Sequence, residues 1–385
     1  MIDYDLPMDV SCSGHGNGQT TQRVVQQESA ATHMPKPNLF HFATSELSQD
    51  AFICWLASCA DASVDDKELR DAGTRFLSAL LATQNLSLPN TPSIRVYRQL
   101  DRIDVAVEIN ESIIVLIEDK VGTADHSGQL KRYLEAARVR FPIHDVVPIY
   151  IQTYIQPGYE GVRAAGFSVL TRRDLMDLLP LNASDSVLSQ FREHLEILEQ
   201  DYESYRFGRV WSFRAWERYL EVITTSLDQC GWSYVPNASG GFLAAYWGWT
   251  ESRFGELYLQ VSQERLSVRI SPSAGTTQAD INAVYSKARE FSEWTVVNAR
   301  RPRKGRTQNL VCLEEDHRRF DQEGNILLEE TVRWLRVTTK KLKSFAKSMM
   351  HDQVLASTST PHTFNVLLAT PQITATTPDR SKASH

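Results

Sequence analysis

Two neighbouring segments with the hydrophobic pattern of β-strands, residues 103–109 and 113–117, constrain the fold most because charged residues interrupt them. The first segment carries Asp104, and the second runs directly into Glu118 and Lys120. Charged side chains are rarely buried in apolar strands unless something compensates the loss of water. The pattern therefore indicates two strands of a buried sheet that meet at a charged site.

The spacing of these residues makes a testable prediction about the connection between the strands. In an antiparallel hairpin, residues that face each other share one face of the sheet, and a shift of one residue separates them. A connection with an odd number of residues pairs Ile109 with Ile113 and places Asp104 opposite Glu118. Lys120 lies two residues further and shares that face. We therefore expect three connecting residues.

Two carboxylates and a lysine on one face have the chemistry of a metal-dependent phosphodiesterase. Carboxylate oxygens are good ligands for Mg²⁺ or Mn²⁺, which keep several waters and bind substrate phosphate. The metal would lower the pKa of a bound water, and Lys120 would orient or help deprotonate that water and stabilise the transition state. Glu46 or Glu108 could supply a further ligand. The competing interpretation is a solvent-exposed sheet edge where charges alternate without function.

Local composition divides the chain into four parts. Residues 1–37 are rich in Ser, Gly, Gln and Thr and are expected to form a flexible leader, and residues 351–385 a disordered tail. Residues 38–200 combine strand and helix patterns and predict an α/β core. Residues 201–350 predict a separate α+β domain that binds substrate or a partner.

Hydrophobic periodicity predicts the individual elements. Helices are expected to begin near Ser45 and Arg172 and to cover residues 67–82, 127–139, 186–227, 281–291 and 327–349. Strands are expected over residues 94–100, 103–109, 113–117, 146–153, 167–170, 294–297 and 309–313, with further short strands between 234 and 270. The expected N-terminal fold is a central mixed sheet flanked by helices.

Bulk properties narrow the function classes. The net charge of −6 weighs against a protein that coats nucleic acid with its whole surface, although it leaves room for a local basic groove. The sequence contains no run of about 18 apolar residues, so it predicts no membrane span. Five scattered cysteines without zinc-ligand spacing indicate reduced thiols and a cytoplasmic protein.

The charged strands resemble the motif of the PD-(D/E)XK nuclease superfamily, in which an Asp on one strand is followed by (Asp/Glu)-x-Lys on the next. Asp104 matches the first position and Glu118-Asp119-Lys120 the second, whereas Ile103 stands where the motif has proline. The resemblance covers about residues 38–180. It implies a restriction-endonuclease-like core and a divalent metal held by Asp104 and Glu118.

Residues on two predicted helices extend the resemblance. Glu46 resembles the acidic residue on the first helix of the family and would be a third metal ligand. Gln129 and Tyr133 resemble the Q-x-x-x-Y motif found in several exonuclease-like branches. They lie one turn apart on a helix, where they could hold a phosphate or the catalytic lysine, or serve only as a packing Tyr and a surface Gln.

The second half of the chain carries basic and aromatic residues that could contact nucleic acid. One group is a basic loop containing Arg300, Arg301, Arg303, Lys304 and Arg306. A second is a late helix with Arg333, Arg336, Lys340, Lys341, Lys343 and Lys347. Trp247 and Trp249 could stack on bases, although a place in the core is the stronger interpretation.

The sequence favours a Mg²⁺-dependent deoxyribonuclease over two other functions. DNA is a more natural substrate than RNA, and the resemblance suggests prokaryotic antiviral defence or a mobile element as context. A non-catalytic scaffold or sensor of the same fold is the main alternative, with a homo-oligomer or protein partner bound through the C-terminal domain. A small-molecule α/β enzyme is disfavoured because the chain lacks a Gly-rich phosphate loop.

Overall fold

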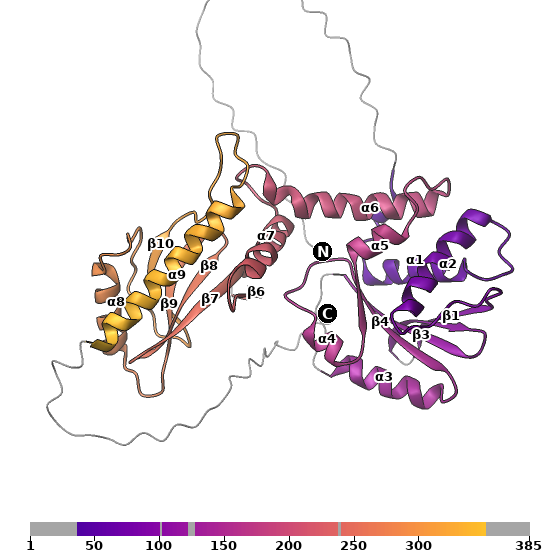
Figure 1. The fold of residues 1–385 in the computed structure, drawn as a ribbon, viewed down its shortest axis with the longest axis horizontal. Helices are drawn as coiled ribbons and strands as arrows, with labels where there is room; N and C mark the ends of the chain where they lie inside the picture. Colours follow the sequence, from indigo (N-terminus) through magenta and orange to yellow (C-terminus); the bar gives the residue numbers. More distant parts are fainter. Residues whose placement is uncertain (1–36, 101, 122–127, 238–239, 352–385) are drawn as a thin grey trace, which may run out of the picture. The chain divides into compact units, whose positions relative to one another are not determined.

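The computed structural model describes residues 37–100, 102–121, 128–237 and 240–351 (Figure 1). The predicted leader up to residue 36 and the predicted tail from residue 352 lie outside the described residues. Two five-stranded sheets organise the rest of the chain, one in each half. Within the described residues, no helix is long and apolar enough to cross a membrane.

The first sheet is mixed, with strand order β1-β2-β3-β4-β5. The first three strands pair antiparallel, and β3, β4 and β5 pair parallel. From β1 to β5 the strands span Ile94–Leu100, Ile103–Ile109, Ile113–Lys120, Asp145–Gln152 and Ser168–Thr171. Nearly every residue of β2 and β3 is buried, as expected for central strands covered on both faces. The predicted mixed α/β sheet is therefore confirmed.

Helices cover both faces of this sheet (Figure 1). Odd-numbered residues such as Val105 and Ile117 form one core cluster with α1 and α2, and even-numbered residues such as Ala106 and Leu116 form another with α3. Helices α5 and α6 complete the first cluster, and α4 completes the second. From α1 to α6 the helices span Glu46–Ser58, Lys67–Ala82, Gln129–Arg140, Glu160–Ala164, Arg172–Leu178 and Ser186–Glu203.

Helix α1 begins where the sequence indicates, because Ser45 is its N-cap and accepts a hydrogen bond from the Ser48 backbone N at 3.3 Å. A short 3₁₀ helix, Leu39–His41, precedes it. The buried face of α1 contains apolar residues such as Phe52, but also two polar ones, Gln49 and Asp50. Buried polar side chains on a helix that faces a sheet need a local reason, and here they face the charged end of β3.

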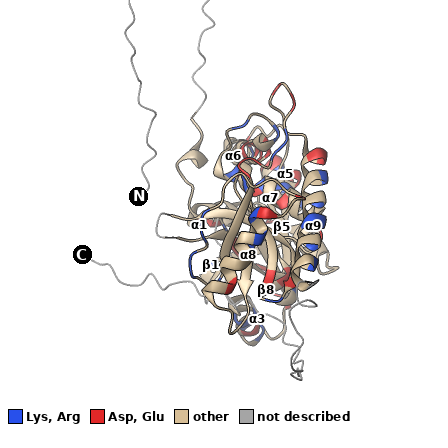
Figure 2. Cartoon of the chain, turned by 90° about the vertical axis from the view of Figure 1, so that its left-hand side faces the viewer, with Lys and Arg blue, Asp and Glu red and all other residues tan. Residues whose placement is uncertain are grey.

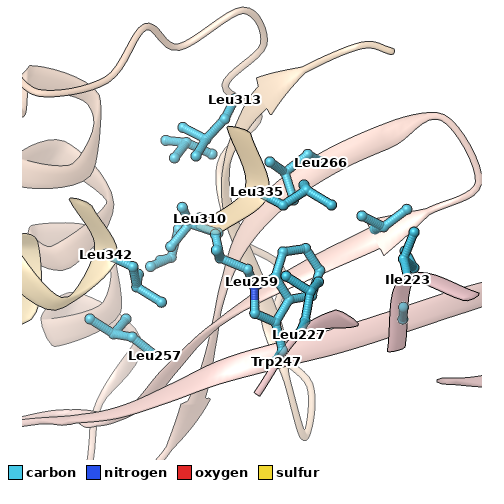
Figure 3. Close-up of a cluster of buried hydrophobic side chains, with 14 of the residues drawn as sticks. Ile223, Leu227, Trp247, Leu257, Leu259, Leu266, Leu310, Leu313, Leu335 and Leu342 are labelled. Atoms are coloured by element: carbon cyan, nitrogen blue, oxygen red, sulfur yellow. The ribbon is translucent and has the colours of Figure 1, made fainter. Parts of the chain in front are cut away.

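The second sheet is antiparallel throughout, in the order β10-β9-β8-β7-β6. From β6 to β10 the strands span Gly231–Val235, Phe242–Ser252, Gly255–Ser262, Arg265–Pro272 and Gln308–Glu314. Helices α7, α8 and α9, spanning Phe213–Ser226, Gln278–Glu290 and Leu328–His351, share one buried cluster with it. Figure 3 shows part of this cluster, including Trp247, Leu335 and Leu342.

Two predictions about the second half were wrong. The helical pattern over residues 186–227 is not one helix, because α6 ends at Glu203, a 3₁₀ turn covers Ser204–Arg206, and α7 begins at Phe213. Residues 294–297 do not form a strand. Trp294 instead packs edge-on against Phe291, with ring centroids 4.6 Å apart, and its indole N–H donates to the Ala288 carbonyl at 2.7 Å.

Candidate active site

The hairpin of β2 and β3 brings the two carboxylates to one face of the first sheet. Ile109 pairs with Ile113 and Val105 with Ile117, so three residues connect the strands, as predicted. The first two, Asn110 and Glu111, adopt left-handed φ values of 52° and 54°. Continuing this register by one position sets Asp104 opposite Glu118.

Lys120 joins the two carboxylates. Its Nζ lies 2.7 Å from Glu118 Oε1 and 3.6 Å from Asp104 Oδ2. Asp104 also accepts a hydrogen bond from the Asp119 backbone N at 3.0 Å, which fixes its carboxylate against the end of β3. The side chains of Asp104 and Lys120 are 25% and 12% exposed, so the trio opens toward solvent on the Asp104 side.

Glu118 is the most constrained member of the trio. It is 2% exposed, and its Oε2 has no hydrogen-bond partner, whereas Oε1 faces Lys120. Burial, together with the negative charge of Asp104, raises the pKa of the Glu118 carboxyl to about 7 despite the nearby ammonium. A carboxylate oxygen buried without a partner is costly, so this side chain is poised to bind a cation.

Lys120 remains an ammonium in this arrangement. Burial lowers its pKa, but the hydrogen bond to Glu118 and the charges of Glu118, Asp104 and Glu46 outweigh that effect and raise the pKa above its usual range. Its Nζ also donates to the Asp119 carbonyl at 3.1 Å. The side chain is therefore a fixed positive charge beside two carboxylates.

Asp119 points to the opposite face of the sheet, toward α1. It is fully buried and accepts a hydrogen bond from Gln49 Nε2 at 2.5 Å, and Gln49 Oε1 accepts one from Thr153 Oγ1 at 3.1 Å. Burial raises the pKa of Asp119 well above its ordinary value. Asp119 therefore faces away from Glu118 and Lys120, and Gln49, which the sequence did not single out, is the residue that holds it.

The acidic residues of α1 reach the end of β3 from the other side. Glu46 Oε1 accepts a hydrogen bond from the Val121 backbone N at 3.2 Å. Asp50, one turn further, is 1% exposed with Oδ1 unpartnered, and burial and the charge of Asp104 raise its pKa to about 7. Two acids one turn apart before an apolar helical face were visible in the sequence, but only Glu46 was assigned a role.

Helix α3 supports the trio through the predicted Gln and Tyr. Gln129 Nε2 donates to Glu118 Oε1 at 3.3 Å and to the Tyr133 hydroxyl at 2.8 Å. Gln129 therefore contacts the carboxylate rather than the lysine, and Tyr133 contacts Gln129. Next to them, Gln152 on β4 pairs with Lys120 in the parallel register and is 1% exposed with its Oε1 unpartnered. The sequence offered one signal for Gln152, a polar residue ending an apolar strand.

Glu108 is not part of this site. It lies four residues beyond Asp104 on the same strand, roughly 13 Å away at about 3.3 Å per residue. Its carboxylate accepts hydrogen bonds from the Tyr97 hydroxyl at 2.7 Å and Arg95 at 3.0 Å, and lies 3.0 Å from His144 Nε2. These partners fully occupy Glu108, so its suggested role as a further metal ligand was wrong.

The predicted basic loop belongs to the other half of the protein. Arg300, Arg301, Arg303, Lys304 and Arg306 lie between α8 and β10 and are all exposed. Within the described residues, none of the five forms an ion pair, and none contacts the trio. Trp247 is a core residue at 1% exposed, as favoured, whereas Trp249 is 38% exposed.

The oxygen atoms of the trio are donors of the type that a divalent metal uses. The described residues contain no group of three or more His, Cys, Asp or Glu side chains arranged to hold an ion. The unpartnered Glu118 Oε2 and the partly exposed Asp104 nevertheless supply hard oxygen donors, the type that Mg²⁺ and Mn²⁺ prefer. These two residues fit such a metal as protein ligands, with water or phosphate completing the coordination.

A mixed five-stranded sheet with Asp on one strand and Glu-x-Lys on the next is the arrangement of the PD-(D/E)XK nuclease fold. A family model described as the PD-(D/E)XK nuclease superfamily matches residues 37–200, and this part of the chain belongs to that superfamily. No curated protein and no solved structure gives a significant match to the chain.

Proposed function

We propose that this protein is a nuclease that hydrolyses phosphodiester bonds in DNA with the help of Mg²⁺ or Mn²⁺. The observation that carries the proposal is the buried, unpartnered Glu118 Oε2 on the same sheet face as Asp104 and Lys120. Such an arrangement costs folding free energy, and a bound cation would offset that cost.

Each residue of the trio has a role in this proposal. Asp104 and Glu118 hold the metal, and Glu46 is the candidate for a further contact beside Val121 N. The metal, when bound, lowers the pKa of water and neutralises charge that develops on the phosphate. Lys120 acts through its fixed positive charge, binding a phosphate oxygen and stabilising the transition state, since its raised pKa disfavours a role as base. Gln129, held by Tyr133, orients Glu118.

Other features support the substrate and the setting. The exposed basic loop gives a nuclease of net charge −6 a local surface for a phosphate backbone. The four described cysteines are free, which fits the reduced cytoplasm. An endonuclease of antiviral defence or of a mobile element, working with a homo-oligomeric or protein partner, is the setting that the superfamily resemblance favours.

Cleavage assays test the proposal directly. Linear, circular and single-stranded DNA and RNA are incubated with the protein in Mg²⁺, in Mn²⁺ and in EDTA. We expect metal-dependent DNA cleavage that Lys120→Ala abolishes and Lys131→Ala, an exposed lysine on α3, retains. Binding measured in EDTA should weaken, with a shallower salt dependence, when Arg300, Arg301 and Arg303 are replaced by alanine. A folded protein that cleaves none of these substrates would indicate the non-catalytic scaffold instead.

A further inference from the structure

Helix α9 separates its charges along its length (Figure 2). Its acidic residues, Glu329 and Glu330, lie in the first turn, and six basic residues follow. Residues three and four positions apart lie on one face of an α-helix. Five of the six basic residues have this spacing and form one row, the basic stripe: Arg333, Arg336, Lys340, Lys343 and Lys347.

The basic stripe faces solvent. Its five side chains are exposed, whereas Leu335, Leu342 and Phe345 on the other side of α9 belong to the buried cluster of the second sheet. The sixth basic residue, Lys341, is half-buried and lies outside the stripe. At about 1.5 Å per residue the stripe is about 21 Å long, and neighbouring cations are about 5 Å apart along the helix axis. It is therefore a line of closely spaced, exposed positive charge.

The basic stripe lacks acidic partners, unlike the exposed Arg173 on α5, which lies 2.5 Å from Glu199 and 2.7 Å from Glu203. In the part of the chain that the structure describes, no stripe residue forms an ion pair. Arg336 donates to the Ser226 carbonyl at 2.7 Å, a neutral acceptor that leaves its positive charge uncompensated. The stripe is therefore not part of a network of surface ion pairs.

The stability of α9 does not explain this arrangement. Like charges three or four residues apart repel each other and destabilise a helix. Basic residues are favourable near the C-terminus of a helix, but that effect is confined to about the last turn. Because α9 ends at His351, the whole stripe from Arg333 to Lys347 precedes the last turn. The stripe therefore has an electrostatic cost that a bound polyanion would offset.

We propose that the basic stripe binds the phosphate backbone of a DNA duplex without reading its sequence. Each strand of a duplex carries a phosphate about every 3.4 Å, so a stripe of about 21 Å meets about six phosphates of one strand. Contacts from lysine and arginine to phosphates fix the position of a duplex but carry no sequence information. This inference rests on the proposed nuclease function for the class of polyanion, and it adds a binding surface beyond the active site and the basic loop.

The stripe fits a duplex better than three other partners. A single strand is held largely by stacking on aromatic rings, and the exposed Trp249 cannot supply that stacking here. Its ring stacks on Tyr258, which alternates with the core residues Leu257 and Leu259 and so lies on the face of the sheet away from α9. A membrane would need the apolar face of α9, which is buried. Lysine is depleted at protein interfaces, whereas three of the five stripe residues are lysines.

Binding of a fluorescein-labelled DNA duplex to the full chain, measured in EDTA over a range of salt concentrations, tests the proposal. The stripe pair Lys340→Gln/Lys343→Gln should weaken binding at low salt at least about tenfold and reduce the slope of log K against log salt by about 1.8, since each duplex contact contributes about 0.9. The control pair Lys341→Gln/Arg289→Gln removes the same charge from the same half of the protein outside the stripe and should change neither quantity much.

Thermal unfolding shows whether the stripe pair is folded. Because the two substitutions relieve repulsion between like charges, the unfolding temperature should equal or exceed that of the wild type. Added duplex should raise the unfolding temperature of the wild type more than that of the stripe pair. Lys340→Arg/Lys343→Arg keeps both charges and should bind the duplex like the wild type.

Equal losses in the stripe and control pairs would overturn the proposal, as would tighter binding of a single strand than of a duplex of the same length. Competition by polyglutamate as strong as that by unlabelled duplex of equal charge would assign the stripe to an acidic protein segment instead. The assay needs neither metal nor cleavage. A protein that binds duplex through the stripe but cuts no substrate would therefore refute the nuclease proposal alone.

Discussion

The two sheets of this protein treat buried polar groups differently. In the described part of the chain, the buried carboxylate oxygens without a hydrogen-bond partner belong to Asp50, Glu118 and Asp119, all at the end of β3 or on the helix facing it. In the second half, the buried Tyr205 hydroxyl and Arg269 Nε also lack a partner, but the buried guanidinium of Arg318 is paired. Arg318, with its side chain 3% exposed, binds Asp316 through Nε at 2.9 Å and Nη2 at 3.0 Å, and the Arg209 carbonyl through Nη1 at 3.1 Å.

The difference separates a site from a structural feature. The Arg318 guanidinium also lies 4.2 Å from the Trp211 ring centroid and 4.6 Å from that of Trp216, so every side of it is satisfied. A satisfied buried charge has no capacity left for a ligand. An unsatisfied carboxylate destabilises the fold unless a ligand completes it, which is why we propose a ligand-binding role for the trio and a structural role for Arg318.

Glu118→Gln should produce the largest effect. It should strongly reduce cleavage without lowering the stability of the fold. The amide keeps the shape but loses the charge that holds a metal, so cleavage should fall by at least about 10³-fold. Removing a buried charge whose pKa is raised should leave the free energy of unfolding near neutral pH unchanged or increased. Initial cleavage rates and urea unfolding measure the two quantities.

Glu135→Gln, an exposed acid on α3, is the matched control and should change neither quantity. If Glu118→Gln destabilised the protein by more than about 1 kcal/mol, the Glu118 carboxylate would be a structural group like Arg318, and the contrast between the sheets would fail.

Arg318→Met should give the opposite result. Methionine retains much of the volume but loses the bidentate pair with Asp316 and the stacking on Trp211 and Trp216, so the free energy of unfolding should fall by about 3 kcal/mol. Cleavage per folded molecule should not change. Arg333→Met on the exposed face of α9 serves as control and should cost about 0.5 kcal/mol or less. A loss of specific activity without a loss of stability would connect the second core to catalysis and remove the distinction.

The sequence predicted that Asp104, Glu118 and Lys120 share one face of the sheet, because that prediction needs only the alternation of strand residues and the length of one connection. Hydrophobic periodicity was also sufficient to predict β1 to β4 and helices α2 and α9. What it could not supply were contacts between distant segments. The burial of Gln49 and Asp50 depends on β3, about 70 residues away, as the Gln49–Asp119 hydrogen bond shows. The apolar Trp294 led to the prediction of a strand. Its side chain instead packs against the core of the second sheet.

The break between α6 and α7 was missed for a different reason. Helical spacing continues across residues 186–227, but two local signals interrupt it between α6 and α7. Gly208 adopts φ +67°, and the Ser212 side chain caps α7 by accepting from the Ala215 backbone N at 3.1 Å. Capping residues are therefore stronger evidence than periodicity wherever the two conflict.

The smallest predicted effect concerns pH, and it tests whether the second core is as well satisfied as its hydrogen bonds indicate. His317 is fully buried, with Nδ1 2.6 Å from the Glu264 carbonyl and Nε2 2.6 Å from the Tyr219 hydroxyl. The carbonyl can only accept, so Nδ1 carries the proton, and Nε2 accepts from the tyrosine. These two bonds fit the neutral ring, and burial lowers the pKa of His317 to about 4.

Because the folded pKa lies below the usual value of about 6.5, the unfolded chain takes up a proton first as the pH falls. The stabilisation is fully present above about pH 6.5 and is lost toward about pH 4, with a loss of about 2 kcal/mol between about pH 7.5 and about pH 5. Urea unfolding of the wild type and of His317→Gln across this range measures it as a difference in slope. Parallel pH profiles would show that His317 is protonated in the folded protein, and the core of the second sheet would then contain an uncompensated charge like those at the end of β3.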